Sequence, residues 1–274
     1  MPAQSAYMKG MSELFRHIRA CNNAVLPGHR LPVLLDGAQI GWTLPATAAE
    51  AASLGAAARD GALHIAAAAL PDLARGLADR GLCRWRAEAF DVRATPDGPA
   101  LGQIDRGALP ALGIGAVGVH LNGLVGDRLW VARRAADKAL DPGKLDHIVA
   151  GGVPSGHTIE QTLVKEAEEE AGMPPELASR ARHTGTIDYA MDRAEGLRRD
   201  RLHCFDIEFP ADFRPEPQDG EVEAFELWPL EQVLDTVRRT DAFKFNVNLV
   251  LIDLFIRRHM LPPEEAASLR SALG

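Results

Sequence analysis

The residues best suited to chemistry lie between positions 151 and 173, in the segment GGVPSGHTIEQTLVKEAEEEAGM. Glu166, Glu169 and Glu170 are spaced i, i+3 and i+4, so in a helix they share one face. Carboxylates this close repel one another, and a divalent cation would offset the repulsion. Mg²⁺ prefers one or two carboxylates together with water and substrate phosphate oxygens. The spacing therefore predicts a metal–phosphate site, with a solvated acidic helix face as the alternative.

The elements around these carboxylates are specified locally. Thr158 and Gln161 form a capping-box pattern, which predicts a helix start near Thr158. Gly172, followed by two prolines, predicts its end. The glycines at 151 and 152 allow backbone to approach a ligand or a metal closely. A glycine loop followed by a capped helix with grouped carboxylates favours the metal–phosphate interpretation over a solvated face.

This segment resembles the Nudix box, whose pattern is G-x5-E-x7-R-E-U-x-E-E-x-G-U with U an aliphatic residue. Counted from Gly151, His157 stands where the family has glutamate, and Lys165 where it has arginine. The three positions that carry metal-binding glutamates in the family are all glutamate here. Lysine keeps the cation but loses the bidentate fork of arginine, so the departures affect the surroundings of the carboxylates more than the carboxylates themselves.

Three longer segments resemble the thiamine-pyrophosphokinase-related Nudix proteins: Phe15–Asn23, Gly118–Gly156 and Leu197–Val233. The resemblance implies a Mg²⁺-dependent pyrophosphohydrolase, with Mn²⁺ as a substitute metal. The implied substrate is thiamine diphosphate or its oxidised forms, cleaved to the monophosphate and phosphate in a housecleaning role. It also favours a homodimer.

The same resemblance assigns roles to individual residues. Glu166, Glu169 and Glu170 would hold the metal, together with a carbonyl of the glycine pair, Gly151 or Gly152. Glu166 and Glu169 are the expected catalytic carboxylates, and Lys165 would orient one of them. For Glu169 a salt bridge to Lys165 at i+4 is an equally weighted alternative.

Four further residues are candidates for contacts with substrate or metal. Glu221, in the late acidic segment DGEVE, would add a carboxylate, with a charged edge strand as the alternative. Lys144 could meet a phosphate as a point charge, with a solvated surface lysine as the alternative. His157 and Gly152 would contact phosphate from the loop, although a structural role is favoured for His157.

Other functions stay open at this stage. One is hydrolysis of a different diphosphate, such as an oxidised nucleoside diphosphate. Another is a ligand-binding regulatory module without hydrolysis, although such a module has no need of three crowded carboxylates. A third is diphosphate isomerisation, which requires a cysteine opposite a glutamate; Cys204 alone lies in the expected catalytic domain, so this reading is weak.

Composition limits the class of protein. The chain has 274 residues and a formal net charge of −8, which argues against nucleic acid as the main partner. The longest apolar run, Leu63–Leu70, is too short to span a membrane, and the first residues lack the apolar core of a signal peptide. Three scattered cysteines indicate reduced thiols. We therefore expect a cytoplasmic enzyme acting on a small molecule.

The pattern of elements predicts an α+β protein with two domains. Residues 1–110 would form a smaller α/β domain that shapes substrate choice or covers the cleft, and residues 111–274 a Nudix fold, a mixed sheet between helices. Expected helices are 12–21, from 47, 71–79, 158–171, from 175, 230–238 and a final one at 245–258. Expected strands are 31–35, 39–44, 63–66, 85–92, 116–125, 128–134, 184–189, 201–209 and 222–228.

Overall fold

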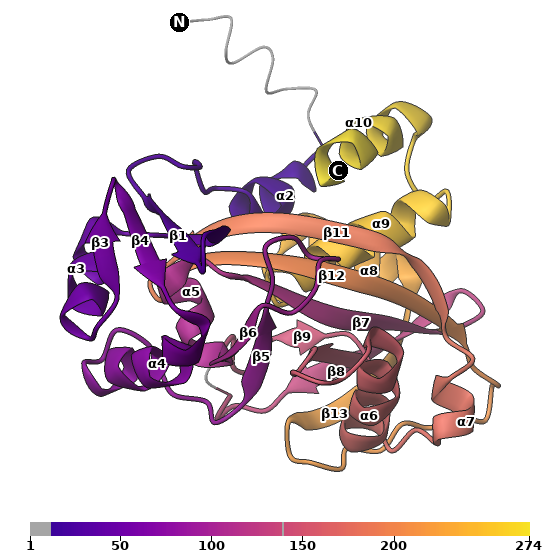
Figure 1. The fold of residues 1–274 in the computed structure, drawn as a ribbon. Coiled ribbons are helices and arrows are strands. Elements are labelled where there is room, and N and C mark those ends of the chain that lie inside the picture. The colour runs from indigo at the N-terminus through magenta and orange to yellow at the C-terminus, as the bar shows by residue number, and fades with distance from the viewer. Residues whose placement is uncertain (1–11, 139) are drawn as a thin grey trace, which may run out of the picture.

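The computed structural model describes residues 12–138 and 140–274, and it combines a mixed β-sheet with helices on both of its faces (Figure 1). The α+β class predicted from the sequence is confirmed. The expectation about a signal peptide concerns residues 1–11, which lie outside the described residues. No helix in the described ranges combines the length and apolarity needed to cross a bilayer.

The larger sheet occupies the C-terminal part of the chain. Its strands follow the order β11-β12-β7-β8-β13, with β10 paired to β7 and β9 paired to β8. β7 and β12 are parallel, while the other pairs are antiparallel. The strands are β7 (Gly115–Val125), β8 (Arg128–Arg134), β9 (Leu145–Asp146), β10 (Val149–Gly152), β11 (Arg182–Arg193), β12 (Gly196–Glu208) and β13 (Val222–Pro229).

Helices cover both faces of this sheet because side chains alternate between the faces along each strand. In β12, Phe205 packs with α6 (Ile159–Ala171) and α7 (Pro175–Ala178). Its neighbour Cys204 packs with α8 (Leu230–Arg239) and α9 (Val247–Arg257) on the opposite face. α9 is buried on almost every side, as expected for a helix that is apolar all round.

The N-terminal part contains a second, four-stranded sheet in the order β2-β1-β4-β3 and a two-stranded ribbon, β5–β6. These elements enclose their own apolar core, which includes Val33, Leu63 and Phe90. The strands are β1 (Leu31–Leu35), β2 (Ala38–Thr43), β3 (Ala57–Arg59), β4 (Ala62–Ile65), β5 (Ala89–Val92) and β6 (Gly102–Asp105). The helices are α3 (Pro45–Ser53), α4 (Leu70–Asp79) and α5 (Leu109–Leu112), with short 3-10 turns at Ala67–Ala69 and Arg106–Ala108.

The first described helix packs away from this N-terminal core. α2 (Phe15–Cys21) places Leu14 and Ile18 in the same apolar cluster as α9. Ser12 donates a hydrogen bond to Glu265 of the C-terminal helix α10 (Pro263–Leu273). Residues near the start of the chain therefore help to cover one face of the C-terminal sheet, as Figure 1 shows.

Turn residues, capping residues and the spacing of apolar residues correctly predicted the turns and most of the helices and strands. The predicted Asp36-Gly37 turn joins β1 and β2, and both residues have positive φ, 47° and 91°, as a tight hairpin turn requires. The first helix begins at Phe15 and not at 12, and the short elements β3, β6, β9, β10 and α5 were not predicted. Two further predictions were wrong. The strand expected at 85–92 is limited to Ala89–Val92, and the helix at 245–258 is not the last one, because α10 follows it. Pro263 and two glutamates in its first turn were the missed start signal.

Candidate active site

Helix α6 carries the grouped carboxylates and begins and ends as its sequence predicted. Thr158 Oγ1 accepts a hydrogen bond from the Gln161 amide (3.1 Å), and Gln161 Oε1 accepts one from the Thr158 amide (2.9 Å). Gly172 has φ +60° at the C-cap. The capping box and the left-handed glycine fix the length of the helix, and with it the positions of its glutamates.

Glu170 is the most buried of these carboxylates, with 7% of its surface exposed. Its Oε2 accepts a hydrogen bond from the Ala150 amide (2.9 Å), which ties α6 to strand β10. Burial raises the pKa of Glu170 well above its usual range, and the charge of Glu166 adds to this rise. Among the described residues, no lysine or arginine forms a salt bridge with Glu170. Burial of a carboxyl without a paired cation favours its neutral form, and a bound cation would stabilise the charged form.

Glu166 lies directly against the glycine pair. A Cβ atom on Gly151 would lie 2.4 Å from the carboxyl carbon of Glu166, so any larger residue there would force the Glu166 side chain to move. Glycine at 151 therefore lets the strand backbone and the Glu166 carboxyl meet. Burial raises the pKa of Glu166, and nearby negative charges, including Glu88 of the N-terminal part, act in the same direction.

Lys165 bridges two of the carboxylates. Its Nζ lies 2.5 Å from Glu169 Oε2 and 3.4 Å from Glu166 Oε1. Burial opposes the charge of Lys165, but the bond to Glu169 and the charge of Glu166 raise its pKa overall. The side chain of Glu169 is about half exposed (48%). The salt bridge considered as the alternative role of Glu169 is thus present, and Glu166 and Glu170 form the inner part of the group.

The loop residues singled out in the sequence differ in their surroundings. Gly152 lies against the N-terminal part, because a Cβ there would be 2.6 Å from Cζ of Phe90. His157 is exposed, and its Nδ1 lies 3.4 Å from the Ser155 carbonyl. This contact fits the structural role that was favoured for His157 just before the helix cap.

The two remaining candidates are engaged by other residues. Glu221 forms an ion pair with Lys138 and precedes the edge strand β13, although its charge still acts on the Glu170 carboxyl. The ammonium of Lys144 donates to the carbonyl of Asp241. Neither contact assigns a role toward substrate.

Residues that the sequence analysis did not single out hold the glycine loop from the N-terminal side. Ser155 Oγ donates to Asp91 Oδ1 (2.6 Å), and Gln103 donates to Ser155 Oγ (2.5 Å). The Ser155 amide donates to the Ala89 carbonyl (2.8 Å). The ribbon β5–β6 therefore braces the loop that faces Glu166. No local signal marks these contacts, since they join residues more than 50 positions apart.

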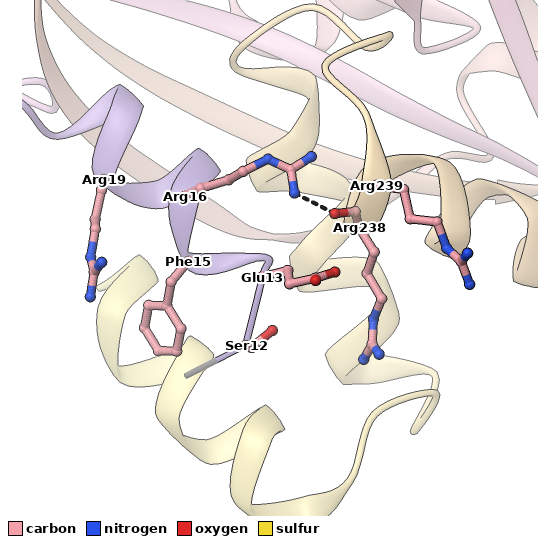
Figure 2. A pocket seen from close by; sticks show the side chains of 7 residues that line it. All are labelled: Ser12, Glu13, Phe15, Arg16, Arg19, Arg238 and Arg239. Carbon is pink, nitrogen blue, oxygen red and sulfur yellow. Dashed lines mark hydrogen bonds between the residues drawn. The ribbon is translucent and has the colours of Figure 1, made fainter. Parts of the chain in front are cut away.

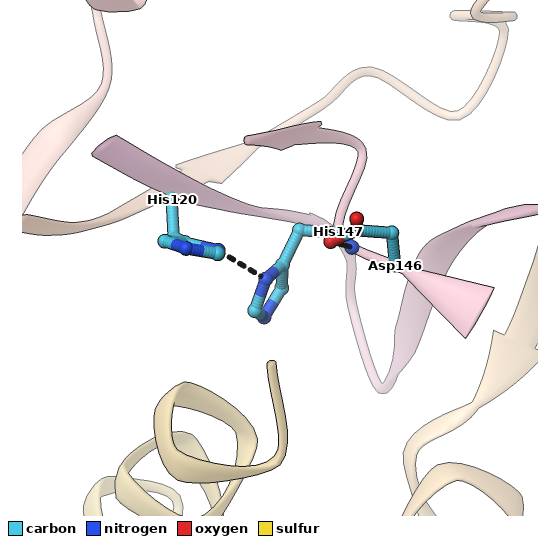
Figure 3. Close-up of side chains that lie close together, drawn as sticks. All are labelled: His120, Asp146 and His147. Carbon is cyan, nitrogen blue, oxygen red and sulfur yellow. Dashed lines mark hydrogen bonds between the residues drawn. The ribbon is translucent and has the colours of Figure 1, made fainter. Parts of the chain in front are cut away.

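A second group of titratable side chains is buried beside the sheet and consists of His120, Asp146 and His147 (Figure 3). We term this group the histidine cluster. Their ligand atoms lie within 4.8 Å of one another, close enough to hold an ion. However, Asp146 is already paired with Arg134 (2.7 Å) and Lys244 (3.4 Å). These cations hold the pKa of Asp146 well below its usual range although burial alone would raise it.

The histidines of this cluster are neutral near pH 7. The two Nδ1 atoms lie 2.9 Å apart. Burial lowers the pKa of His147 to about 4 and that of His120 well below its usual value. Because two cations already outnumber the single carboxylate, a further positive ion would be repelled there. We interpret the cluster as part of the folded core.

The two cavities of interest differ in their surroundings. One, of about 440 Å³, lies beside α2 and the end of α8, where Arg16 donates to the Arg238 carbonyl (Figure 2). The other, of about 350 Å³, lies between residues 91–96 and strands β7, β11 and β12. The second cavity adjoins the braced glycine loop, because Asp91 lines the cavity and bonds to Ser155.

Comparison with known proteins agrees with this architecture. Residues 113–248 match the family model described as NUDIX domain. The matched part of the chain includes β7, α6 and the glycine loop.

Two curated relatives come from Arabidopsis thaliana. "Nudix hydrolase 20, chloroplastic" is 40% identical over 206 residues, covering 73% of this chain and 55% of the relative. "Nudix hydrolase 24, chloroplastic" is 43% identical over 183 residues, covering 65% and 50%. The chain thus spans about half the length of these relatives. A crystal structure of DR0079 from Deinococcus radiodurans aligns with 60% of this chain and 97% of its own, at 22% identity and a TM-score of 0.43.

Proposed function

We propose that the protein is a divalent-metal-dependent Nudix hydrolase that cleaves the phosphoanhydride bond of a small diphosphate compound. The observation that carries the proposal is the carboxyl of Glu170. It is buried, bonded to the backbone of β10 and unpaired with any cation among the described residues, beside Glu166. The Nudix domain match and the names of the relatives support the same class of reaction.

The donors present fit a hard divalent cation. Glu166 and Glu170 offer carboxylate oxygens, and the backbone of Gly151 lies directly against the Glu166 side chain. Oxygen donors of this kind suit Mg²⁺, with Mn²⁺ as a substitute. When bound, the metal would neutralise diphosphate charge and activate water.

The protein's own residues would position these groups. In the proposed reaction, water attacks phosphorus, and the bond from phosphorus to the bridging oxygen breaks, giving a monophosphate and inorganic phosphate. Glu166 is the candidate to take the proton from the attacking water. Lys165, held by Glu169, would orient Glu166, and the brace from Asp91 to Ser155 would fix the loop.

The finer proposal concerns the substrate, which we infer to be thiamine diphosphate or its oxidised forms. Support comes from the resemblance of residues 15–23, 118–156 and 197–233 to the thiamine-pyrophosphokinase-related Nudix proteins. The cavity of about 350 Å³ beside the glycine loop is large enough for the organic part of such a molecule. The N-terminal residues that line it fit the expected role of that region in substrate choice.

A phosphate-release screen with Mg²⁺ tests the proposal. The panel would contain thiamine diphosphate, its oxo and oxy forms, an oxidised nucleoside diphosphate and inorganic pyrophosphate. We expect release from at least one organic diphosphate, lost on chelation with EDTA. Strongest release from the nucleoside compound would favour the alternative substrate. Binding of these compounds without release from any of them would instead indicate a regulatory binding module.

A further inference from the structure

Two histidines on neighbouring strands form a pair near the edge of the larger sheet. His183 lies on β11 and His203 on β12, and Nε2 of His183 lies 3.2 Å from Nδ1 of His203. His183 is exposed and His203 is half-buried, so solvent reaches the pair. The two nitrogens can share one hydrogen bond, or both can act as ligands of one metal ion.

The separation of these nitrogens is close to that of two ligands on a tetrahedral zinc ion. Bonds from zinc to histidine nitrogen are about 2.0–2.1 Å long, so at the tetrahedral angle two such nitrogens lie about 3.3–3.4 Å apart. The observed distance is 3.2 Å. Small rotations of the two rings would aim both lone pairs at one ion, and water can complete the coordination on the exposed side of His183.

The sheet holds both rings in place. β11 and β12 are paired antiparallel along their length, with a shift in register between His183 and Gly185. The ring of His183 also meets the ring of Phe205 edge-on, with centroids 5.0 Å apart. Because two paired strands present the imidazoles, little conformational entropy is lost when they bind an ion.

The charges around the pair can accommodate a cation. Burial, the ring of His183 and the charge of Arg201 lower the pKa of His203, whereas Asp97 and Glu160 raise it. The ring is therefore neutral near pH 7 and keeps a lone pair for a metal. Arg201 bonds to two carboxylates, one of them Asp97 (2.7 Å), which offset its charge. In the histidine cluster, by contrast, two cations surround a single carboxylate.

The pair lies on the same face of the sheet as the candidate active site. Phe205, two residues after His203, packs in the apolar cluster of α6, and side chains two positions apart along a strand share a face. His203 and Gly151 have the same register partner on β7, Val119. With about 4.8 Å between neighbouring strands, the backbones of His203 and Gly151 lie roughly 10 Å apart. The pair is thus close to the carboxylates of α6 and separate from them.

We propose that His183 and His203 bind one Zn²⁺ ion, at a site distinct from the carboxylates of α6. Imidazole nitrogen suits Zn²⁺, whereas Mg²⁺ prefers oxygen ligands. The two sites therefore take different metals. The inference does not depend on the proposed hydrolysis.

Calorimetry of Zn²⁺ binding to the full-length protein in saturating Mg²⁺ tests this inference. Mg²⁺ competes for the carboxylate oxygens and leaves the imidazoles free. His183→Gln and His203→Gln each remove one ligand, and His29→Gln, an exposed histidine of the N-terminal part, is the matched control. Glu170→Gln weakens the carboxylate site and shows whether Zn²⁺ binds there instead.

We expect one Zn²⁺ per chain in the wild-type protein and in Glu170→Gln. His183→Gln and His203→Gln should each raise the Kd at least tenfold, and His29→Gln should change it less than twofold. Zn²⁺ should also raise the urea midpoint of the wild-type protein but not that of His183→Gln, because an ion that binds only the folded state stabilises it. The same unfolding curves show that each variant is folded, and His183 is exposed enough to be replaced without loss of packing.

Three results would overturn the inference. One is wild-type affinity for Zn²⁺ in folded His183→Gln, and another is no binding of Zn²⁺ by the wild-type protein in saturating Mg²⁺. The third is loss of Zn²⁺ binding in Glu170→Gln with retention in His183→Gln, which would place the ion at α6. Phosphate release is not a readout here, so a failure of the proposed hydrolysis leaves this test unaffected.

Discussion

Two groups of titratable side chains lie within electrostatic reach of each other, and they differ in charge balance. The carboxylate cluster of α6 consists of Glu166, Glu169 and Glu170, and in the described part of the chain Lys165 is the one lysine paired with it, at its outer side. The histidine cluster has one carboxylate, Asp146, held by two cations, and two neutral histidines. In the first group, burial raises the pKa of Glu166 and Glu170 because too few cations stabilise their charged forms, whereas in the second group two cations stabilise one carboxylate.

This difference separates a candidate ligand site from a part of the core. Buried charges that compensate one another fix the packing of the elements that carry them. Like charges held together are unfavourable unless something else binds there. The short distances between the possible ligand atoms of the histidine cluster, taken alone, would suggest a metal site. The ion pairs of Asp146 with Arg134 and Lys244 instead favour a structural role.

The largest expected effect tests the structural side of this comparison. Asp146→Asn would leave Arg134 and Lys244 buried without their counter-charge. We expect a loss of about 3 to 5 kcal/mol in the free energy of unfolding, measured in urea. Asp212→Asn, in an exposed loop, is the control. Equal stability of the two variants would contradict a structural role for the histidine cluster.

The next effect tests the carboxylate cluster. Glu170→Gln removes a charge while keeping size and a hydrogen-bond acceptor, so turnover should fall by at least two orders of magnitude, roughly 3 kcal/mol of transition-state stabilisation. Stability should be unchanged or slightly higher, because a buried like charge disappears. Glu168→Gln, exposed on the same helix, should retain activity. Full activity of Glu170→Gln at saturating Mg²⁺ would exclude Glu170 from the site.

The pH dependence of stability tests the neutral state of the histidines. His147 has a pKa of about 4 in the folded protein, against 6.5 for an exposed histidine. Between these values the unfolded chain binds the proton and the folded protein does not, so stability falls as pH falls. From pH 6.5 to about pH 5 the loss from this residue should be about 1.5 kcal/mol.

Urea unfolding at the two pH values measures this loss. His147→Gln should show a smaller decrease than the wild-type protein, with the remainder arising from His120 and other groups. An identical decrease in both proteins would mean that His147 titrates normally in the folded state.

The smallest expected effect concerns Lys165. If this lysine orients Glu166 through its position between two carboxylates, Lys165→Met should lower kcat/KM about tenfold, or about 1.4 kcal/mol. Lys165→Arg keeps the cation and should retain most activity. The measurement is phosphate release by both variants. Equal activity of the methionine and arginine variants would reduce Lys165 to a surface residue.

Much of the fold and part of the candidate site could be predicted because their signals are local. The capping box at Thr158, the left-handed Gly172 and the Asp36-Gly37 turn each depend on residues within four positions of one another, and each is present. Glu166 and Glu170 were placed together by helical spacing alone. The missed helix α10 had a local signal too, at Pro263.

The sequence by itself therefore determined the carboxylate helix, its ends and most strands, since hydrogen bonds within a turn or a helix depend on near neighbours. Only the tertiary structure decided which carboxylate is buried and that the ribbon β5–β6 braces the glycine loop. Such contacts join residues such as Asp91 and Ser155, 64 positions apart. Burial and charge balance belong to the packed molecule, because they depend on which distant side chains fill the surrounding space.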